Sequence, residues 1–556
     1  MKHQVMQISA LEKVRANEEL NFNGINKIKA MQGERVSYQI VLKGERNSRF
    51  RAGVSVKSEL ASAVVLYSVK EVVMDTPVTD DFPDDDYITK EPGLMPDVLV
   101  PLSEQKFTVT VTDSNSVLWV RIDVPEDIAP GKYVVSVQFK MTEAFSDIPE
   151  NTLCKDMEIE IIPAVIPQQK LIYTRWFYAD CIAEEHNVPI YSEKHWDLIE
   201  KYIAAAHDVG INMILVPIHT PPLDTEIGAE RPCVQLVDIE RIGDEYKFGF
   251  EKFHRFISIC KKCGIKYYEM AHMFSQWGAK NTPNIMVREN GQERYMFGWH
   301  MPADSPVYLD FVSRYIKAVC AELTKEGIAD NTYFHISDEP NEGSMENYER
   351  AYKIIKPLVG KSKLFDAISD FDFYEKGIVE NPVPCISSIK EFLGKDIEHL
   401  WTYYCCEPQN VYPNSFLAMP SARVRVLGYM LYKYDIKGFL HWGLNFYNSF
   451  KSWYKINPYL TTSADGVFPS GDGYILYPGK DTVYGSIRGE VTYQAIIDMN
   501  ICFALEEIIG RDAVIKMIDK AAGGELRFDQ YPSGNSFLEE LRLDMINKIE
   551  AYTEDK

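Results

Sequence analysis

The sequence predicts a multidomain α/β protein: an N-terminal antiparallel β-sandwich over residues 1–165, then a (β/α)8 TIM-like barrel with a C-terminal helical extension over residues 166–556. Up to residue 165, short runs rich in β-branched and aromatic residues alternate with turns and show almost no helical periodicity. After that point, similar runs alternate with helical patterns, which is typical of a parallel sheet with crossover helices. The 556 residues, 46% of them hydrophobic, are sufficient for two or more cores.

The N-terminal strands are recognised by their β-prone composition and by the turns between them. A proline-glycine turn at Pro130-Gly131, for example, separates two such runs. The expected strands are Ser37–Leu42, Ala63–Val73, Lys106–Thr112, Val117–Val124, Lys132–Lys140 and Met157–Ile162.

The barrel prediction depends on the number of strand-like runs between residues 170 and 445, because a closed barrel needs eight. An open doubly wound sheet remains the alternative, since the fifth and sixth runs are weak. The expected strands are Ile172–Tyr178, Asn212–Ile218, Lys266–His272, Thr332–Ser337, Leu364–Ser369, Val383–Ser387, Leu400–Cys405 and Gly438–Leu444. The expected crossover helices are Glu193–Asp208, Glu251–Cys263, Pro306–Lys325, Ser344–Val359 and Ser421–Tyr434.

Charge and composition exclude several classes of partner. A formal net charge of −22 disfavours nucleic acid and anionic membranes, because phosphate binding depends on clustered Lys and Arg. We therefore expect a neutral small-molecule or oligosaccharide substrate. No long apolar segment and no signal-peptide core is present, which predicts a cytoplasmic protein. The ten cysteines are irregularly spaced and predict reduced thiols.

The most informative segment is Asn331–Pro340, a strand-like run that ends in the adjacent acids Asp338 and Glu339. Neighbouring side chains on a strand point to opposite faces, so both acids can reach one cavity only if the pleat breaks there. Pro340 cannot continue a ladder and is expected to hold Glu339 in an extended or polyproline conformation. The alternative is that the acids cap the helix expected from Ser344 onward.

Polar and aromatic residues follow several of the predicted strands, at the edge where a barrel has its active site. Rings beside hydrogen-bonding groups suit a carbohydrate, whose C–H faces stack on aromatics while its hydroxyls bind polar partners. A metal site formed by His219, His272 and His441, with or without Asp224, is an alternative, but no metal-binding spacing supports it. We expect no metal and no cofactor.

Several motifs together carry a family resemblance: Trp176–Ala183, Asn212–Pro217, Thr220–Thr225, Ser337–Pro340, Gly438–Gly443, and Gly471-Asp-Gly with Tyr477-Pro-Gly479. In these segments the chain resembles glycoside hydrolase family 123 and its uncharacterised relatives. The resemblance implies a sandwich followed by a barrel, and retaining removal of terminal β-linked N-acetylgalactosamine by substrate-assisted catalysis.

By that resemblance, Asp338 would orient the substrate's 2-acetamido group, whose carbonyl oxygen attacks the anomeric carbon to give an oxazolinium intermediate. Glu339 would act as the acid and then as the base. Adjacent acids suit this chemistry, because an ordinary retaining enzyme needs two carboxylates about 5 Å apart across the scissile bond. We expect a raised pKa for Glu339 and an ionised Asp338.

Other residues are expected to bind the sugar. Tyr403 or Tyr404 is the candidate donor to the acetamido oxygen, and Trp442 the candidate wall of its pocket. Further candidates for contact with the substrate are His272, His441, Asn445, Asp180, Asp224 and Asp472.

Two other functions remain open at this stage. One is a glycosidase of the same fold that acts on a sugar without an acetamido group. The other is a non-catalytic carbohydrate-binding protein.

Overall fold

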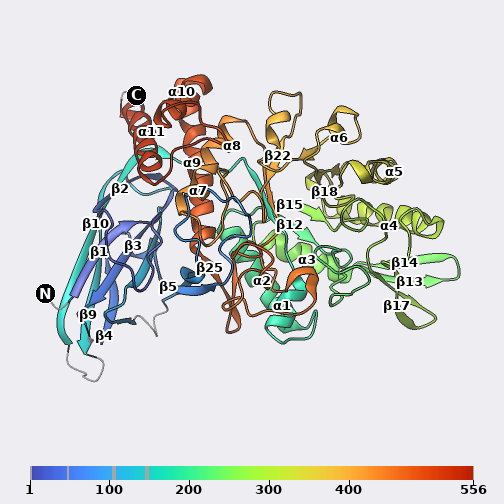
Figure 1. Ribbon diagram of the computed structural model, residues 1–556, viewed down its shortest axis with the longest axis horizontal. Coiled ribbons are helices and arrows are strands. Elements are labelled where there is room, and N and C mark those ends of the chain that lie inside the picture. The colour runs from blue at the N-terminus through green and yellow to red at the C-terminus, as the bar shows by residue number, and fades with distance from the viewer. Residues whose placement is uncertain (1–2, 47–48, 103–107, 144–148, 555–556) are drawn as a thin grey trace. The chain divides into compact units, whose positions relative to one another are not determined.

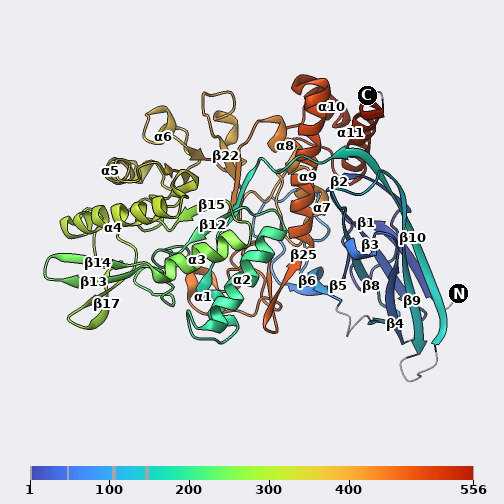
Figure 2. The same ribbon diagram turned by 180° about the vertical axis from the view of Figure 1, so that it is seen from behind.

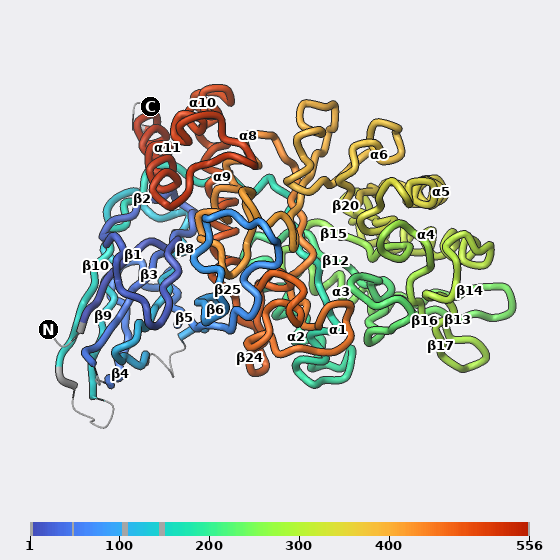
Figure 3. Tube along the Cα trace, viewed as in Figure 1, coloured from blue at the N-terminus to red at the C-terminus, as the bar shows by residue number. Residues whose placement is uncertain are grey.

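The computed structural model describes residues 3–46, 49–102, 108–143 and 149–554 (Figure 1). The chain, whose course can be followed in Figure 3 by its colouring from the N-terminus to the C-terminus, divides into two compact units. Unit 1 comprises residues 1–170, 409–433 and 484–556, and unit 2 comprises residues 171–408 and 434–483. The sequence prediction had placed everything after residue 165 in one domain, so the structure differs in assigning residues 409–433 and 484–556 to the unit that contains the N-terminal sheets.

Unit 1 is built on two β-sheets that share one hydrophobic core. Tyr38 and Leu118 from one sheet and Phe139 and Ile159 from the other belong to the same fully buried cluster. The first sheet contains, in spatial order, β1 (His3–Ser9), β3 (Arg35–Gly44), β8 (Ser116–Asp123), β5 (Val64–Met74), β6 (Gly93–Pro101) and β25 (Thr482–Ser486). The second contains β2 (Lys27–Gln32), β10 (Pro149–Val165), β9 (Gly131–Glu143), β4 (Phe50–Lys57) and β7 (Thr108–Val111).

The described N-terminal strands confirm the predicted antiparallel arrangement with one exception. Strand β10 pairs with β2 in parallel, while its other neighbour, β9, is antiparallel to it. The start of the predicted strand Lys106–Thr112 lies outside the described residues. Unit 1 also contains helices α7 (Ser421–Arg425), α8 (Leu427–Lys433), α9 (Ile487–Ile509), α10 (Arg511–Ala521) and α11 (Ser536–Glu554).

Unit 2 contains a curled, all-parallel sheet whose strands are short, buried and largely apolar. In β12 (Met213–Val216) all four side chains are buried, as expected for a strand covered on both faces. The remaining strands of this sheet are β19 (Lys363–Leu364), β18 (Thr332–Phe334), β15 (Tyr267–Met270), β11 (Ile172–Arg175), β23 (Gly438–His441) and β22 (Trp401–Tyr403). Their spatial order is β19-β18-β15-β12-β11-β23-β22.

Seven of the eight predicted strand segments of the barrel contain strand residues of β11, β12, β15, β18, β20 (Asp366–Ala367), β22 or β23. Val383–Ser387 shares only Val383 with the observed strand β21 (Pro382–Val383), and the ladder is not one continuous closed sheet. Strands β20 and β21 form a separate parallel pair, and an isolated bridge joins Cys385 to Tyr403. The structure therefore shows a curled parallel sheet with a short additional pair. A complete (β/α)8 barrel remains a prediction.

The helices of unit 2 begin at residues that are typical of helix starts. Ser192 caps α2 (Glu193–Asp208) by accepting a hydrogen bond from the His195 N–H. Pro306 opens α4 (Pro306–Lys325), where its fixed φ suits the first helical turn. The other helices are α1 (Ala179–Glu185), α3 (Glu251–Lys262), α5 (Met345–Ile355) and α6 (Asp372–Glu375).

A small mixed sheet is inserted into unit 2 and is seen from behind in Figure 2. It contains β14 (Glu245–Gly249), β13 (Asp238–Ile242), β16 (Ile285–Glu289) and β17 (Gln292–Phe297), and unit 2 also has the short strand β24 (Tyr477–Gly479). No helix in the described part of the chain combines the length and apolar character needed to cross a bilayer.

Candidate active site

A cavity of about 200 Å³ lies within unit 2, where the loops follow the carboxyl ends of the parallel strands. It is smaller than the 300–1,000 Å³ or so that is typical of drug-sized ligand pockets, which favours a ligand of the size of one sugar ring. Its carboxylates come from Asp224, Asp338 and Glu339. Its aromatic lining consists of Trp176, Tyr178, Trp277, Tyr403, Trp442, Phe450 and Phe468.

Asp338 and Glu339 both line the cavity because the backbone leaves the extended conformation at the second acid. Glu339 has a φ of 42°, in the left-handed region that a residue with a Cβ rarely adopts. The expectation of an extended Glu339 before Pro340 was therefore wrong. The backbone N–H of Trp277, itself at a φ of 61°, donates to the Asp338 carbonyl at 2.8 Å. Strained backbone of this kind concentrates at functional sites.

The loops after β15 and β18 are bound to each other through Ser337. Its hydroxyl accepts from the Gly278 and Ala279 N–H groups, at 3.1 and 3.0 Å, and donates to the Ser275 carbonyl at 2.7 Å. Gly278 has a φ of 102°, and a Cβ there would lie 2.2 Å from that of Ser344. These contacts fix the segment that carries the two acids.

The alternative of acids that cap a helix is not what the structure shows. The chain after Pro340 begins a 3₁₀ turn, Glu342–Ser344, that continues into α5. A capping box between Asn341 and Ser344 satisfies its start, with the Asn341 N–H donating to the Ser344 hydroxyl at 2.9 Å. Asp338 and Glu339 therefore take no part in this cap.

Tyr403 contacts the second acid directly. Its hydroxyl donates to Glu339 Oε1 at 2.6 Å, from the end of β22. The neighbouring Tyr404 does not line the cavity and is fully buried, with its ring against Phe439 and His441. Of the two predicted donors, the structure brings only Tyr403 to the acids.

The electrostatics of the acids differ from expectation. Burial, and next the Glu339 carboxylate, raise the pKa of Asp338 well above its usual range, while the nearby His335 acts in the opposite direction. The sequence predicts an ionised Asp338, whereas the raised pKa shifts this carboxyl toward its protonated form. Burial likewise raises the pKa of Asp224 to about 6, although its carboxylate accepts a hydrogen bond from the Lys451 N–H at 3.2 Å.

Trp442 forms one wall of the cavity, and the residues behind it hold its ring. Its indole N–H donates to Asp472 Oδ2 at 2.8 Å. His441 Nδ1 accepts from the Gly443 N–H at 2.9 Å, which leaves Nε2 facing Asp472 Oδ1 at 3.3 Å. His441 and Asp472 are buried and do not line the cavity, so they support this wall.

Asn445 and Asp180 also lie behind the lining. Asn445 bonds both backbone groups of Tyr178, accepting from its N–H at 3.0 Å and donating to its carbonyl at 2.9 Å. Asp180 forms a buried bidentate ion pair with Arg231, at 2.8 and 3.0 Å. The Arg231 guanidinium lies 5.1 Å from the centre of the Tyr178 ring. The Tyr178 hydroxyl is buried and has no hydrogen-bond partner among the described residues.

A buried charged triad beneath the acids was not predicted from the sequence. His335 bonds Asp366 Oδ1 through Nδ1 at 2.9 Å and Glu269 Oε1 through Nε2 at 2.6 Å. Glu269 also accepts from the Trp176 indole at 2.5 Å. Burial opposes protonation of His335, but the bonds to Asp366 and Glu269 outweigh it and raise its pKa to about 9. A buried imidazolium therefore lies three residues before Asp338.

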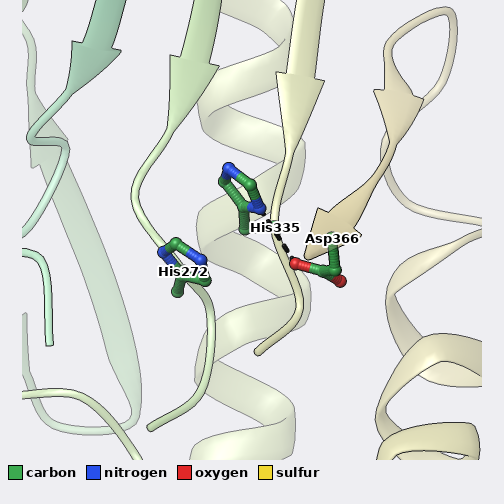
Figure 4. Close-up of side chains that lie close together, drawn as sticks. All are labelled: His272, His335 and Asp366. Atoms are coloured by element: carbon green, nitrogen blue, oxygen red, sulfur yellow. Dashed lines mark hydrogen bonds and ion pairs between the residues drawn. The ribbon is translucent and has the colours of Figure 1, made fainter. Parts of the chain in front are cut away.

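His272 stacks on this triad and does not reach the cavity (Figure 4). Its ring is 4.0 Å from that of His335, at an interplanar angle of 12°. His272, His335 and Asp366 are close enough to be considered together as metal ligands. However, the in-plane lone pairs of parallel rings do not converge on one ion, and both His335 nitrogens already face carboxylates. The arrangement does not fit a metal site.

The sequence interpretation missed several cavity residues. Tyr178 and Trp277 were noted only as aromatics after predicted strands, while Phe450 and Phe468 lie in a long loop without periodicity. The aromatics that precede the glycine-rich Gly471-Asp-Gly segment are the signal that could have pointed to this loop.

Comparison with known proteins identifies the family. The catalytic-domain profile of glycoside hydrolase 123 matches residues 176–505. The structure is similar to a family 123 glycoside hydrolase from Clostridium perfringens, studied for glycolipid glycan hydrolysis, with a TM-score of 0.72 and 15% identity over 100% of this chain and 98% of that one. A mutant β-glucuronidase 2 from Bacteroides uniformis gives a TM-score of only 0.28, with 9% identity over 84% of this chain and 48% of that one.

A search of curated protein sequences finds no match. The profile match nevertheless takes in more than half of the chain and all of the acids that line the cavity. The protein belongs to glycoside hydrolase family 123.

Proposed function

We propose that this protein is a retaining exo-glycosidase that removes a terminal β-linked N-acetylgalactosamine, or a related 2-acetamido sugar, by substrate-assisted catalysis. The observation that carries the proposal is the pair Asp338 and Glu339, adjacent in sequence and both on a cavity of monosaccharide size. Adjacent acids are suited to neighbouring-group chemistry, in which the substrate supplies the nucleophile.

In the first step, the acetamido carbonyl oxygen attacks the anomeric carbon as the glycosidic C–O bond breaks. Glu339 donates its proton to the departing oxygen, and Asp338 accepts a hydrogen bond from the acetamido N–H. In the second step, water attacks the anomeric carbon and reopens the oxazolinium ring, while Glu339 takes the proton of that water. The sugar leaves with its original β configuration.

The raised pKa of Asp338 is compatible with this scheme. A hydrogen bond donated to a carboxylate favours its ionised form, so a bound acetamido N–H would lower the pKa of Asp338. The His335 imidazolium acts in the same direction. Ionised Asp338 would then stabilise the positive charge that develops on the cyclising acetamide.

The other lining residues have natural roles in this proposal. Tyr403 orients Glu339 through their hydrogen bond, and Trp442 forms a flat wall for the acetamido group. The Tyr178 hydroxyl, which is buried and has no hydrogen-bond partner within the described part of the chain, is a further donor for the sugar.

A second candidate is a conventional glycosidase that acts on a sugar without an acetamido group. It is favoured by Asp224, a third carboxylate on the same cavity, which would serve as the nucleophile in a two-carboxylate mechanism. In that case Asp224→Asn would abolish turnover, whereas Asp338→Asn would be tolerated.

The decisive experiment is hydrolysis of paired nitrophenyl β-glycosides of N-acetylgalactosamine, N-acetylglucosamine, galactose and glucose. Release from the acetamido sugars alone, lost in Asp338→Asn and inhibited by a thiazoline mimic of the cyclised intermediate, is the expected result. Release from galactose or glucose, with Asp338→Asn still active, would reject the substrate-assisted mechanism. Sugar binding without any turnover would favour a binding protein.

A further inference from the structure

A row of aromatic rings leads from the cavity to the surface of unit 2. The Trp442 ring is 5.3 Å from that of Phe468, which is 5.8 Å from that of Phe450. Phe450 in turn lies 5.8 Å from Trp453, at an interplanar angle of 83°. The first three rings line the cavity, and Trp453 is the next ring outward.

Trp453 is exposed but held in place. Its side chain is 59% exposed. Its indole N–H donates to Glu226 Oε2 at 3.0 Å, and Lys451 Nζ lies 3.2 Å from the same oxygen. An isolated surface tryptophan needs no such fixation.

The backbone that presents Trp453 is strained on both sides of this contact. Lys451 and Ser452 have φ values of 54° and 55°, and Asp224, two residues before Glu226, has a φ of 41°. The two segments are joined, because the Ser452 hydroxyl donates to the Asp224 carbonyl at 2.7 Å and the Glu226 N–H donates to the Lys451 carbonyl at 2.9 Å. Left-handed residues that a structure maintains in this way are typical of ligand clamps.

We propose that Trp453, with Glu226 and Lys451, forms a subsite outside the cavity that binds the sugar ring on the leaving-group side of the scissile bond. The inference rests on the proposed exo-glycosidase function, which places the terminal sugar inside the cavity. A fixed, exposed indole offers its face to the C–H surface of a pyranose, and the adjacent ion pair offers partners for its hydroxyls.

The test compares leaving groups that are all alkoxides, so that the demand for protonation stays similar. The substrates are the methyl β-glycoside, the octyl β-glycoside and a β-linked disaccharide of the same terminal sugar, and kcat and KM are measured for each. We expect Trp453→Ala to lower kcat/KM for the disaccharide by about tenfold, mainly through KM, and Trp453→Phe to recover part of it. For the methyl glycoside, the factor by which Trp453→Ala lowers kcat/KM should be at least about fivefold smaller than for the disaccharide.

Tyr552→Ala is the matched control, because Tyr552 is an exposed aromatic of unit 1 outside the cavity lining. This substitution should leave kcat/KM unchanged for both the methyl glycoside and the disaccharide. Equal losses on the methyl glycoside and the disaccharide would overturn the subsite. An octyl glycoside as sensitive to Trp453→Ala as the disaccharide would also overturn it, since the surface would then be an unspecific apolar contact.

Failure of the subsite can be told apart from failure of the proposed function. If the unaltered protein hydrolyses only non-acetamido glycosides, the acetamido function fails, and the same three leaving groups on the accepted sugar test Trp453. If nothing is hydrolysed, saturation-transfer NMR with the free disaccharides replaces kinetics. A sugar signal that Trp453→Ala removes supports the subsite, whereas an unchanged signal or no binding at all overturns it.

Discussion

At the scale of single residues, the site depends on a hydrogen bond to the acid and on a backbone turn that brings two neighbouring acids to one cavity. Tyr403 and Tyr404 are consecutive tyrosines, yet only Tyr403 reaches Glu339. Tyr404 is buried elsewhere against Phe439 and His441. The two tyrosines therefore allow the same substitution, Tyr→Phe, to be compared at neighbouring positions, of which only one contacts the acid.

We predict that Tyr403→Phe lowers kcat/KM by about tenfold to a hundredfold, because a hydrogen bond to a charged group contributes about 1.5–3 kcal/mol. Tyr404→Phe should change it by less than about threefold, as expected for a hydroxyl that makes no contact with the reacting groups. Steady-state kinetics on the same glycoside checks both variants. A larger loss in Tyr404→Phe would contradict the assignment of Tyr403.

A graded dependence on the leaving group is expected when the acid is removed. Glu339→Gln should nearly abolish cleavage of alkyl β-glycosides and spare aryl glycosides with good leaving groups, because these need little protonation. Asp338→Asn should impair both, since neighbouring-group attack accompanies either departure. The measurement is the slope of log kcat/KM against leaving-group pKa for a series of aryl and alkyl glycosides. Equal loss of activity across the whole series in Glu339→Gln would contradict its role as the acid.

The sequence was sufficient to predict which residues lie near the end of each strand, but not which way they face. Asp224, Asp338, Glu339, Tyr403 and Trp442 line the cavity as expected. The remaining candidates, His272, His441, Asn445, Asp180, Asp472 and Tyr404, lie behind the lining. Their partners come from distant segments, as Arg231 does for Asp180, and no local pattern reports such contacts.

At the scale of elements, the buried triad combines Glu269 of β15, His335 directly after β18, and Asp366 of β20. The sequence anticipated a strand at each position. The segment that contains β19, β20 and β21 shows why closure of the barrel was harder to predict, because two-residue strands carry no measurable periodicity. The contacts that place them come from other segments: the Asp366 carboxylate of β20, for example, accepts from the Ile336 N–H at 3.0 and 3.1 Å.

Removal of the central imidazole should therefore destabilise unit 2 strongly. We expect His335→Phe to lower the free energy of unfolding at pH 6.5 by about 3–5 kcal/mol, because it leaves the buried Glu269 and Asp366 carboxylates without their cation. Urea unfolding followed by tryptophan fluorescence measures the change. The control is Glu349→Gln, which breaks the exposed Glu349–Lys353 pair on α5 and should cost at most about 0.5 kcal/mol. Comparable effects in the two variants would show that the triad carries no net charge interaction.

At the scale of the whole molecule, stability depends on pH through buried groups in both units. The pKa of His335 is raised from 6.5 to about 9, so its stabilisation is fully present below pH 6.5 and is lost as the pH rises through about 9. Burial lowers the pKa of Lys13, in unit 1, to about 7, which acts in the opposite direction over an overlapping range. The acidic net charge of −22 adds repulsion that salt screens.

A difference between two proteins isolates the His335 contribution from these other effects. Between pH 6 and pH 9.5, the stability advantage of the unaltered protein over His335→Phe should shrink by about 3 kcal/mol, since one pKa unit corresponds to about 1.4 kcal/mol. Lys13 and the net charge are present in both proteins, so their contributions cancel in the difference. Urea unfolding at half-unit pH intervals in 0.5 M salt provides the measurement. An advantage that stays constant across this range would mean that the pKa of His335 is the same in the folded and unfolded states, and the proposed help of its imidazolium in ionising Asp338 would fall with it.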